Sequence, residues 1–142
     1  MRLYDFIHKL DKLNIYRNCD DPSTIDCVCY VPRRKTIVGY PIVSMSVVST
    51  HDTTKVILNA VYETYEGRNC IKLDQLYNDL KDLYRYLDKV ERRCTVFMSV
   101  QQSKTSPITY RTIPIWGDFI LDPDRDAMFI KATNSASYLK NI

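Results

Sequence analysis

The sequence predicts an α+β fold in which an antiparallel or mixed sheet carries helices packed on one face. Large apolar residues recur at alternating three- and four-residue steps between residues 73 and 90, which is the spacing of one buried helical face. Runs rich in Val, Ile and Tyr flank this helix and are joined mostly by turns, as in antiparallel sheets. The 142 residues, 45% of them hydrophobic, suffice for one core, so a single domain over residues 1–142 is expected.

Up to residue 50, the sequence predicts one helix and two strands. An apolar stripe indicates a helix over residues 2–15, which ends before the turn-forming residues at 20–23. Strands are expected at residues 25–31 and 36–50, where β-branched residues and tyrosines dominate. Because proline has no N–H to donate to a ladder, Pro41 is expected at a sheet edge or at a strand start.

The segment after His51 has two interpretations. Ile57, Val61 and Tyr65 are four residues apart, which fits a helix, and Gly67 stands where a helix C-cap is expected. The alternative continues the β-branched run as a strand. The four-residue spacing favours the helix.

Further strands are predicted after the long helix. Residues 94–101 alternate in the manner of a strand with one well-buried face. Residues 108–116 and 118–121 are expected to form a strand pair across the glycine between them, with Pro114 placing the first strand at an edge or ending it early. A short apolar run lies at residues 128–130, and no internal repeat is visible.

Composition narrows the class of protein. The 20 basic and 17 acidic side chains leave a net charge of +3, so polyanion binding would have to come from local clusters. The five cysteines include no Cys-x-x-Cys pair and predict neither a disulfide framework nor a zinc site. The sequence contains no apolar run long enough to span a membrane, and its first residues do not form a signal peptide. A cytoplasmic protein without a cofactor is therefore expected.

Candidate catalytic residues are few. His8 lies on the flank of the first predicted helix and is interpreted as structural. His51 stands at a junction between elements, where it can cap a helix or serve as a base for Cys27 or Cys29. Buried cysteines usually behave as small hydrophobes, so a non-enzymatic protein is favoured over a small hydrolase or nuclease that uses His51.

The densest carboxylate cluster begins within the second strand of the last predicted pair and continues beyond it. Asp122 starts a partial match to a calcium-binding loop, but Ala127 replaces the loop's glycine and Thr133 its bidentate glutamate. A solvated turn is expected and no metal site, although the same carboxylates would serve a nuclease together with His51. The three glycines are isolated, which excludes a glycine-rich phosphate loop. The cluster comprises Asp118, Asp122, Asp124 and Asp126.

Basic residues cluster at a predicted hairpin tip, at the end of the long helix and in a later turn. Cations at a helix C-terminus also offset the helix dipole, so the middle cluster has a local explanation as well. Tyr30, Tyr40 and Tyr110 are near these cations in sequence, and aromatic side chains among cations can stack on RNA bases. RNA or acidic lipid headgroups are the expected ligands. The candidate contacts are Arg33, Arg34, Lys35, Arg92, Arg93 and Lys104.

A second candidate interface is apolar. Ile113, Ile115, Trp116 and Phe119 would form a docking patch for a host protein if they were exposed. The alternative is that Trp116 anchors the core.

The order of elements between residues 43 and 116 resembles a known family. A strand at 44–48 leads into an amphipathic helix ending at Gly67, and a further helix, a strand after Arg93, a polar loop and a strand ending at Trp116 follow. This block resembles the core of rhabdovirus matrix proteins. The resemblance implies a small viral protein without catalytic residues. The sequence lacks the Lys- and Pro-rich N-terminal arm of that family, so its assembly would rest on folded surfaces.

These patterns together predict a non-enzymatic cytoplasmic protein of viral origin that works by binding and self-association. Its expected partners are RNA or an anionic membrane surface, a host protein, or a second copy of the chain.

Overall fold

The computed structural model describes residues 1–32, 37–61, 63, 65–66, 69–90, 92–101 and 110–132 of the chain. The helices are α1 (Leu3–Leu13), α2 (Ile15–Asn18) and α3 (Leu73–Lys89). The strands are β1 (Asp26–Pro32), β2 (Ile37–Ser49), β3 (Thr53–Ala60), β4 (Arg93–Gln101), β5 (Tyr110–Asp122) and β6 (Ala127–Ala132). Short 3₁₀ turns, η1 (Pro22–Thr24) and η2 (Pro123–Arg125), precede β1 and β6.

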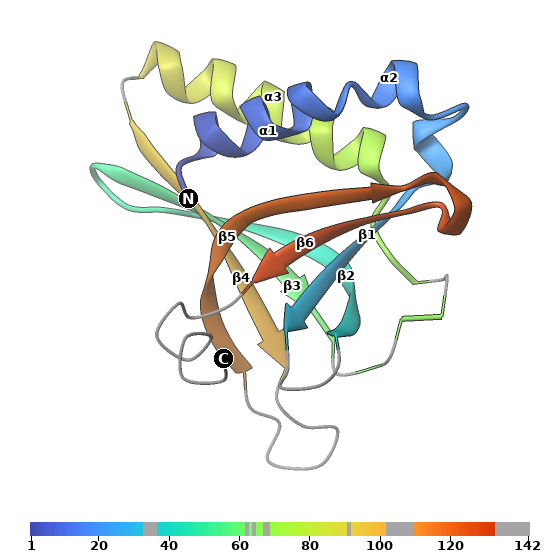
Figure 1. Ribbon diagram of the computed structural model, residues 1–142. Coiled ribbons are helices and arrows are strands. Elements are labelled where there is room, and N and C mark those ends of the chain that lie inside the picture. The colour runs from blue at the N-terminus through green and yellow to red at the C-terminus, as the bar shows by residue number, and fades with distance from the viewer. Residues whose placement is uncertain are drawn as a thin grey trace.

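The six strands form a closed barrel in the order β1-β2-β3-β4-β5-β6. Neighbours pair antiparallel, except that β3 pairs with β4 and β1 with β6 in parallel. Figure 1 shows α1 and α3 side by side on one side of this barrel. The predicted combination of helices with a mixed sheet is confirmed. Because the strands close into a barrel, the expected arrangement of a sheet with helices packed on one face does not describe the architecture.

The segment after His51 forms a strand, so the favoured helix is wrong. In β3 the side chains of Thr54, Val56, Leu58 and Ala60 are buried in strict alternation. The strand lies between β2 and β4 and is paired on both sides. Such a position favours β-branched residues, and this tertiary preference overrides the four-residue spacing of the apolar side chains.

Two long strands change neighbours along their length, and each carries a proline at that point. Pro41 forms the last pair of β2 with β1, and Ile42 forms the first pair with β3. Likewise, Pro114 forms the last pair of β5 with β4, and Ile115 the first with β6. The missing N–H therefore falls where one ladder gives way to the next. The predicted edge positions of both prolines are wrong, and so is the predicted break of β5 at Gly117.

The barrel consists of two halves with the same order of elements. α1, β1, β2 and β3 form one half, and α3, β4, β5 and β6 form the other. Both consist of a helix followed by three antiparallel strands, and the two parallel pairs join one half to the other. The internal repeat that is not visible in the sequence is therefore present in the topology.

In each half, the residue that precedes the helix pairs with a strand of the other half. Arg2, which precedes α1, forms an antiparallel bridge with Thr95 of β4, and Lys72, which precedes α3, forms one with Asp26 of β1. Each helix is thus attached at its start to the first strand of the other half. This arrangement fixes the start of α1 beside the start of β4.

One cluster of buried apolar side chains joins the helices to the strands. α1 contributes Phe6 and Leu10, both fully buried, and α3 contributes Leu76 and Leu80 from its predicted apolar row. Val90, the last member of that row, lies beyond the end of α3 and is exposed. The sequence pattern therefore located the buried face of the long helix correctly but extended the helix by one residue too far.

A phenol links the two helices and makes stability dependent on pH. Tyr77 of α3 donates a hydrogen bond to the Asp11 carboxylate of α1. Burial and this carboxylate raise the pKa of Tyr77 to about 12, above the roughly 10 of an unfolded chain. As the pH rises between these two values, the unfolded state loses the proton first, so the free energy of unfolding falls.

We expect Tyr77→Phe to lower stability by about 1 kcal/mol at neutral pH and to reduce the alkaline loss of stability. Urea unfolding at neutral pH and at about pH 11, midway across the window, measures both effects. Tyr86→Phe, on the exposed face of the same helix, is the matched control and should change neither. If Tyr77→Phe lost as much stability at high pH as the unchanged protein, groups other than Tyr77 would be responsible for the loss.

Candidate anion-binding surface

A hollow with three arginines lies where α1 begins, α3 ends and β4 begins. Its volume is about 620 Å³. Arg2 is the residue before α1, Arg92 lies between α3 and β4, and Arg93 is the first residue of β4. We call it the arginine hollow. It is lined by Arg2, Leu3, Tyr4, Tyr84, Leu87, Asp88, Arg92, Arg93, Cys94 and Thr95.

A second hollow shares two of these arginines. It has a volume of about 690 Å³ and is lined by His51, Asp52, Thr53, Val90, Arg92 and Arg93. Its far wall is the turn between β2 and β3, which lies on the same side of the molecule as the end of α3 (Figure 1). The parallel register of β3 and β4, which pairs Thr53 with Arg93, brings the two walls together. Arg92 and Arg93 therefore face two adjoining concave regions, which together form the arginine surface.

The cations of the arginine surface have no internal partners in the described part of the chain. None of Arg2, Arg92 and Arg93 forms an ion pair with a described carboxylate. Asp88 and Asp52 line the two hollows, and Asp52 lies 3.8 Å from the His51 imidazole. A cation before α1 also opposes the dipole of that helix, so Arg2 is not explained by helix stability. Unpaired guanidinium groups in a concave surface are suited to bind oxyanions.

Aromatic side chains stand beside the arginines. Tyr4 is 57% exposed and meets Tyr84 of α3 with ring centroids 5.9 Å apart. The Tyr4 ring also stacks on His8, at 6.0 Å and an interplanar angle of 5°. Both tyrosines line the arginine hollow. An exposed ring beside cations can stack on a nucleobase.

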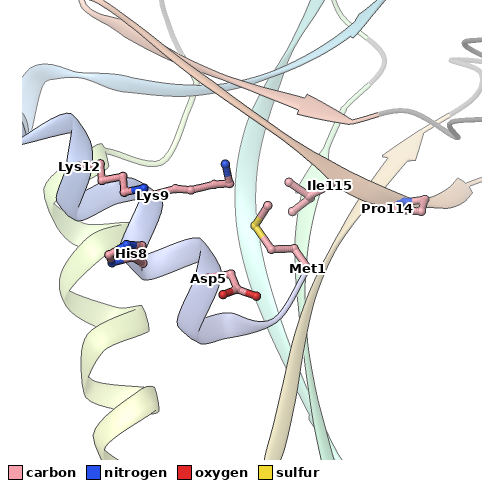
Figure 2. Close-up of a pocket in the computed structure, with 7 residues that line it drawn as sticks. All are labelled: Met1, Asp5, His8, Lys9, Lys12, Pro114 and Ile115. Carbon is pink, nitrogen blue, oxygen red and sulfur yellow. The ribbon is translucent and has the colours of Figure 1, made fainter.

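α1 borders another hollow on its opposite flank. Figure 2 shows Lys9 reaching from α1 toward the strands, while Met1 lies beside Ile115 of β5. The volume is about 520 Å³, and Asp5 provides a carboxylate among the cations. The hollow is lined by Met1, Asp5, His8, Lys9, Lys12, Pro114 and Ile115. Its opposite charges and its separation from Arg92 and Arg93 make it the weaker candidate for binding a polyanion.

Only part of the predicted basic cluster can be placed. Arg92 and Arg93 lie together in the arginine surface. The other predicted contacts lie outside the residues that the structure describes: Arg33, Arg34, Lys35 and Lys104. Arg2 and His51 join the surface, although sequence reasoning did not include Arg2. The strand pairing that brings Arg2 to β4 leaves no local pattern near residue 2, so no sequence signal indicated it.

The tyrosines predicted to stack on RNA are mostly inaccessible. Tyr30 and Tyr40 are buried within β1 and β2, so their predicted stacking role is wrong. Tyr110 is exposed at the start of β5. The accessible aromatic residues beside the arginines are Tyr4 and Tyr84, which come from the two helices.

The predicted apolar docking patch is part of the core where it is described. Ile113 and Ile115 are buried, and Phe119 is half-buried with its ring 4.7 Å from that of Phe6. Alternation along β5 turns these side chains into the barrel. The side chain of Trp116 lies outside the described residues. Docking of a host protein through Phe119 is therefore not supported.

The alternative catalytic pair does not form. The His51 side chain is 98% exposed at the turn between β2 and β3. Cys27 and Cys29 are completely buried, and burial raises the pKa of both thiols, that of Cys29 to about 12. A thiol in this environment stays protonated at neutral pH and is a poor nucleophile. His51 caps no helix either, because the segment that follows it is a strand.

The aspartates near the end of β5 stabilise a turn. The Asp122 carboxylate accepts hydrogen bonds from the N–H groups of Asp124 and Arg125, and it lies 3.4 Å from the Arg125 side chain. Asp118 lies 3.6 Å from Lys131. Within the described ranges, no three His, Cys, Asp or Glu side chains are placed to hold a metal ion.

Comparison of the chain with protein families, with curated proteins and with solved structures finds no match. The resemblance to rhabdovirus matrix proteins therefore stays a prediction. No helix in the described part of the chain has the length and apolarity needed to cross a bilayer.

Proposed function

We propose that this protein binds single-stranded RNA through the arginine surface and performs no catalysis there. The observation that carries the proposal is the convergence of Arg2, Arg92 and Arg93 on one concave surface without partners among the described carboxylates. Phosphate contacts supply most of the affinity of such surfaces, and they release counterions from the nucleic acid.

The aromatic residues favour RNA over a lipid surface. Tyr4 and Tyr84 stand in the same hollow as the arginines, which suits a ligand that alternates phosphates with flat bases. An acidic membrane would be met best by a flat or convex cationic face with apolar residues that can insert. The arginine surface is hollowed, and its guanidinium groups are gathered around the cavities.

The first test removes the two arginines shared by both hollows. Arg92→Ala/Arg93→Ala should weaken binding of a labelled single-stranded RNA of about 12 nucleotides by roughly 10- to 100-fold at low salt. The slope of log affinity against log salt should become less steep by about 1.4, which corresponds to two lost phosphate contacts at about 0.7 each. Fluorescence anisotropy over roughly 50 to 200 mM salt measures both quantities.

The matched control is Arg17→Ala/Arg111→Ala, which removes two exposed arginines outside the three hollows. It carries the same change in net charge and should keep most of the affinity. Equal losses in the two double variants would show that only overall charge matters and would contradict a specific surface. Binding to phosphatidylserine vesicles without binding to RNA would overturn the proposal in favour of a membrane ligand.

A further inference from the structure

Each half of the barrel begins with a cation at the N-cap of its helix. The backbone conformations are similar, with φ −71° and ψ 148° at Arg2 and φ −91° and ψ 148° at Lys72. Each cation is bridged to the first strand of the other half, Arg2 to Thr95 and Lys72 to Asp26. The leucines that follow, Leu3 and Leu73, are both buried. Arg2 with Thr95 and Lys72 with Asp26 therefore occupy equivalent positions in the two halves.

The two positions differ in charge. Lys72 donates to the Asp26 carboxylate, which also accepts a hydrogen bond of 2.9 Å from the Tyr65 hydroxyl. The Asp26 side chain is only 5% exposed, so this anion is held inside the protein. In the other half, Thr95 stands in place of the aspartate and supplies a hydroxyl. Arg2 therefore occupies the position equivalent to Lys72, but no buried carboxylate lies there to balance its charge as Asp26 balances that of Lys72.

We infer that the Arg2–Thr95 position is a binding site for one phosphate group, which takes the place that the Asp26 carboxylate holds in the other half. The inference rests on the proposed function for the class of its ligand, a phosphate of bound RNA. Both residues line the arginine hollow together with Arg92 and Arg93. An arginine fork bonds two phosphate oxygens at once, and a threonine hydroxyl can donate to a third. Asp88 also lines the hollow, but the guanidinium groups outnumber it.

The test supplies the missing carboxylate. Thr95→Asp reproduces the arrangement of the other half and should pair with Arg2, leaving no place for an external anion. Titration of inorganic phosphate, followed by backbone amide chemical shifts, should move the signals of residues 2–4 and 92–95 in the unchanged protein. In Thr95→Asp the affinity for phosphate should fall by at least about tenfold.

Two variants separate this site from general electrostatics. Thr95→Asn has nearly the shape of the aspartate without its charge and should keep phosphate binding within about threefold. Val90→Asp adds the same charge beside Arg92 and Arg93, in the adjoining hollow, and should weaken phosphate binding less than Thr95→Asp does. Equal losses in Thr95→Asp and Val90→Asp would overturn the inference, as would phosphate-induced shifts confined to the hollow around Lys9 and Lys12.

Failure of the inference is distinguishable from failure of the proposed function. If Thr95→Asp binds RNA and phosphate as the unchanged protein does, while Arg92→Ala/Arg93→Ala loses RNA, the Arg2–Thr95 site is wrong and the RNA surface stands. If phosphate binds at Arg2 and Thr95 but RNA does not bind at all, the site stands and the RNA function is wrong.

Discussion

Replacing Phe6 with alanine is expected to lower the free energy of unfolding by about 3–5 kcal/mol. Phe6 is fully buried on α1, and its ring meets that of Phe119 on β5 edge-on, with centroids 4.7 Å apart. The substitution removes the buried ring and the aromatic contact, and it leaves a cavity between helix and barrel that neighbouring side chains can fill only in part. Chemical denaturation followed by circular dichroism measures the loss.

Two control substitutions, one at Phe6 itself and one elsewhere on α1, test whether the buried ring causes the loss of stability. Phe6→Leu keeps most of the apolar volume and should cost no more than about 1.5 kcal/mol. Tyr4→Ala removes an exposed ring from the same helix and should cost about 0.5 kcal/mol or less. A Phe6→Ala variant no less stable than Tyr4→Ala would mean that α1 is not anchored to the barrel through this ring.

Replacing Asp26 with alanine is expected to cost about 2–4 kcal/mol. The carboxylate is the shared acceptor for the Lys72 ammonium and the Tyr65 hydroxyl, so its removal leaves two donors unpaired. The loss stays below that of a fully enclosed ion pair, because the Lys72 side chain is 42% exposed and can regain water. Urea unfolding of Asp26→Ala, Lys72→Ala and the double variant yields the coupling energy between the two residues.

The equivalent residue in the other half provides the control. Thr95→Ala removes a half-buried hydroxyl with no ion-pair partner and should cost less than about 1 kcal/mol. A coupling energy near zero between Asp26 and Lys72 would show that the pair contributes nothing to stability. A cost for Thr95→Ala equal to that of Asp26→Ala would show that the charge of Asp26 contributes nothing beyond the packing of a side chain at this position.

The helices α1 and α3 were predictable because apolar residues that repeat with the helical period indicate a helix buried on one side. The apolar residues that face the core in α1 and α3, such as Leu10 and Leu80, repeat with the helical period, and each is fully buried. β1 and β2 were also predictable from their content of Val, Ile and Tyr, and β4 from its alternation of buried and partly buried side chains. β3 was not, because Ile57 and Val61 satisfy a helical spacing by coincidence, and the choice is made by strands on either side.

Barrel closure could not be derived from local patterns. It depends on the parallel pairing of β1 with β6 and of β3 with β4, which are contacts between segments distant in the chain. The same limit explains the site. Arg92 and Arg93 stand out in the sequence as adjacent cations, but Arg2 reaches them only because its bridge to Thr95 sets α1 beside β4.

The pairing of β1 with β6 has a consequence for how the molecule is made. Residues 26–30 pair with their second neighbour only when residues 127–131 are present, so this ladder forms only after the other strands of the barrel have been synthesised. Pairing of segments so distant in sequence costs loop-closure entropy before the new contacts can stabilise the chain. It is typical of proteins that fold slowly, in roughly milliseconds to seconds. Until then one side of β1 has unpaired backbone groups, and a nascent chain is most prone to misassembly there.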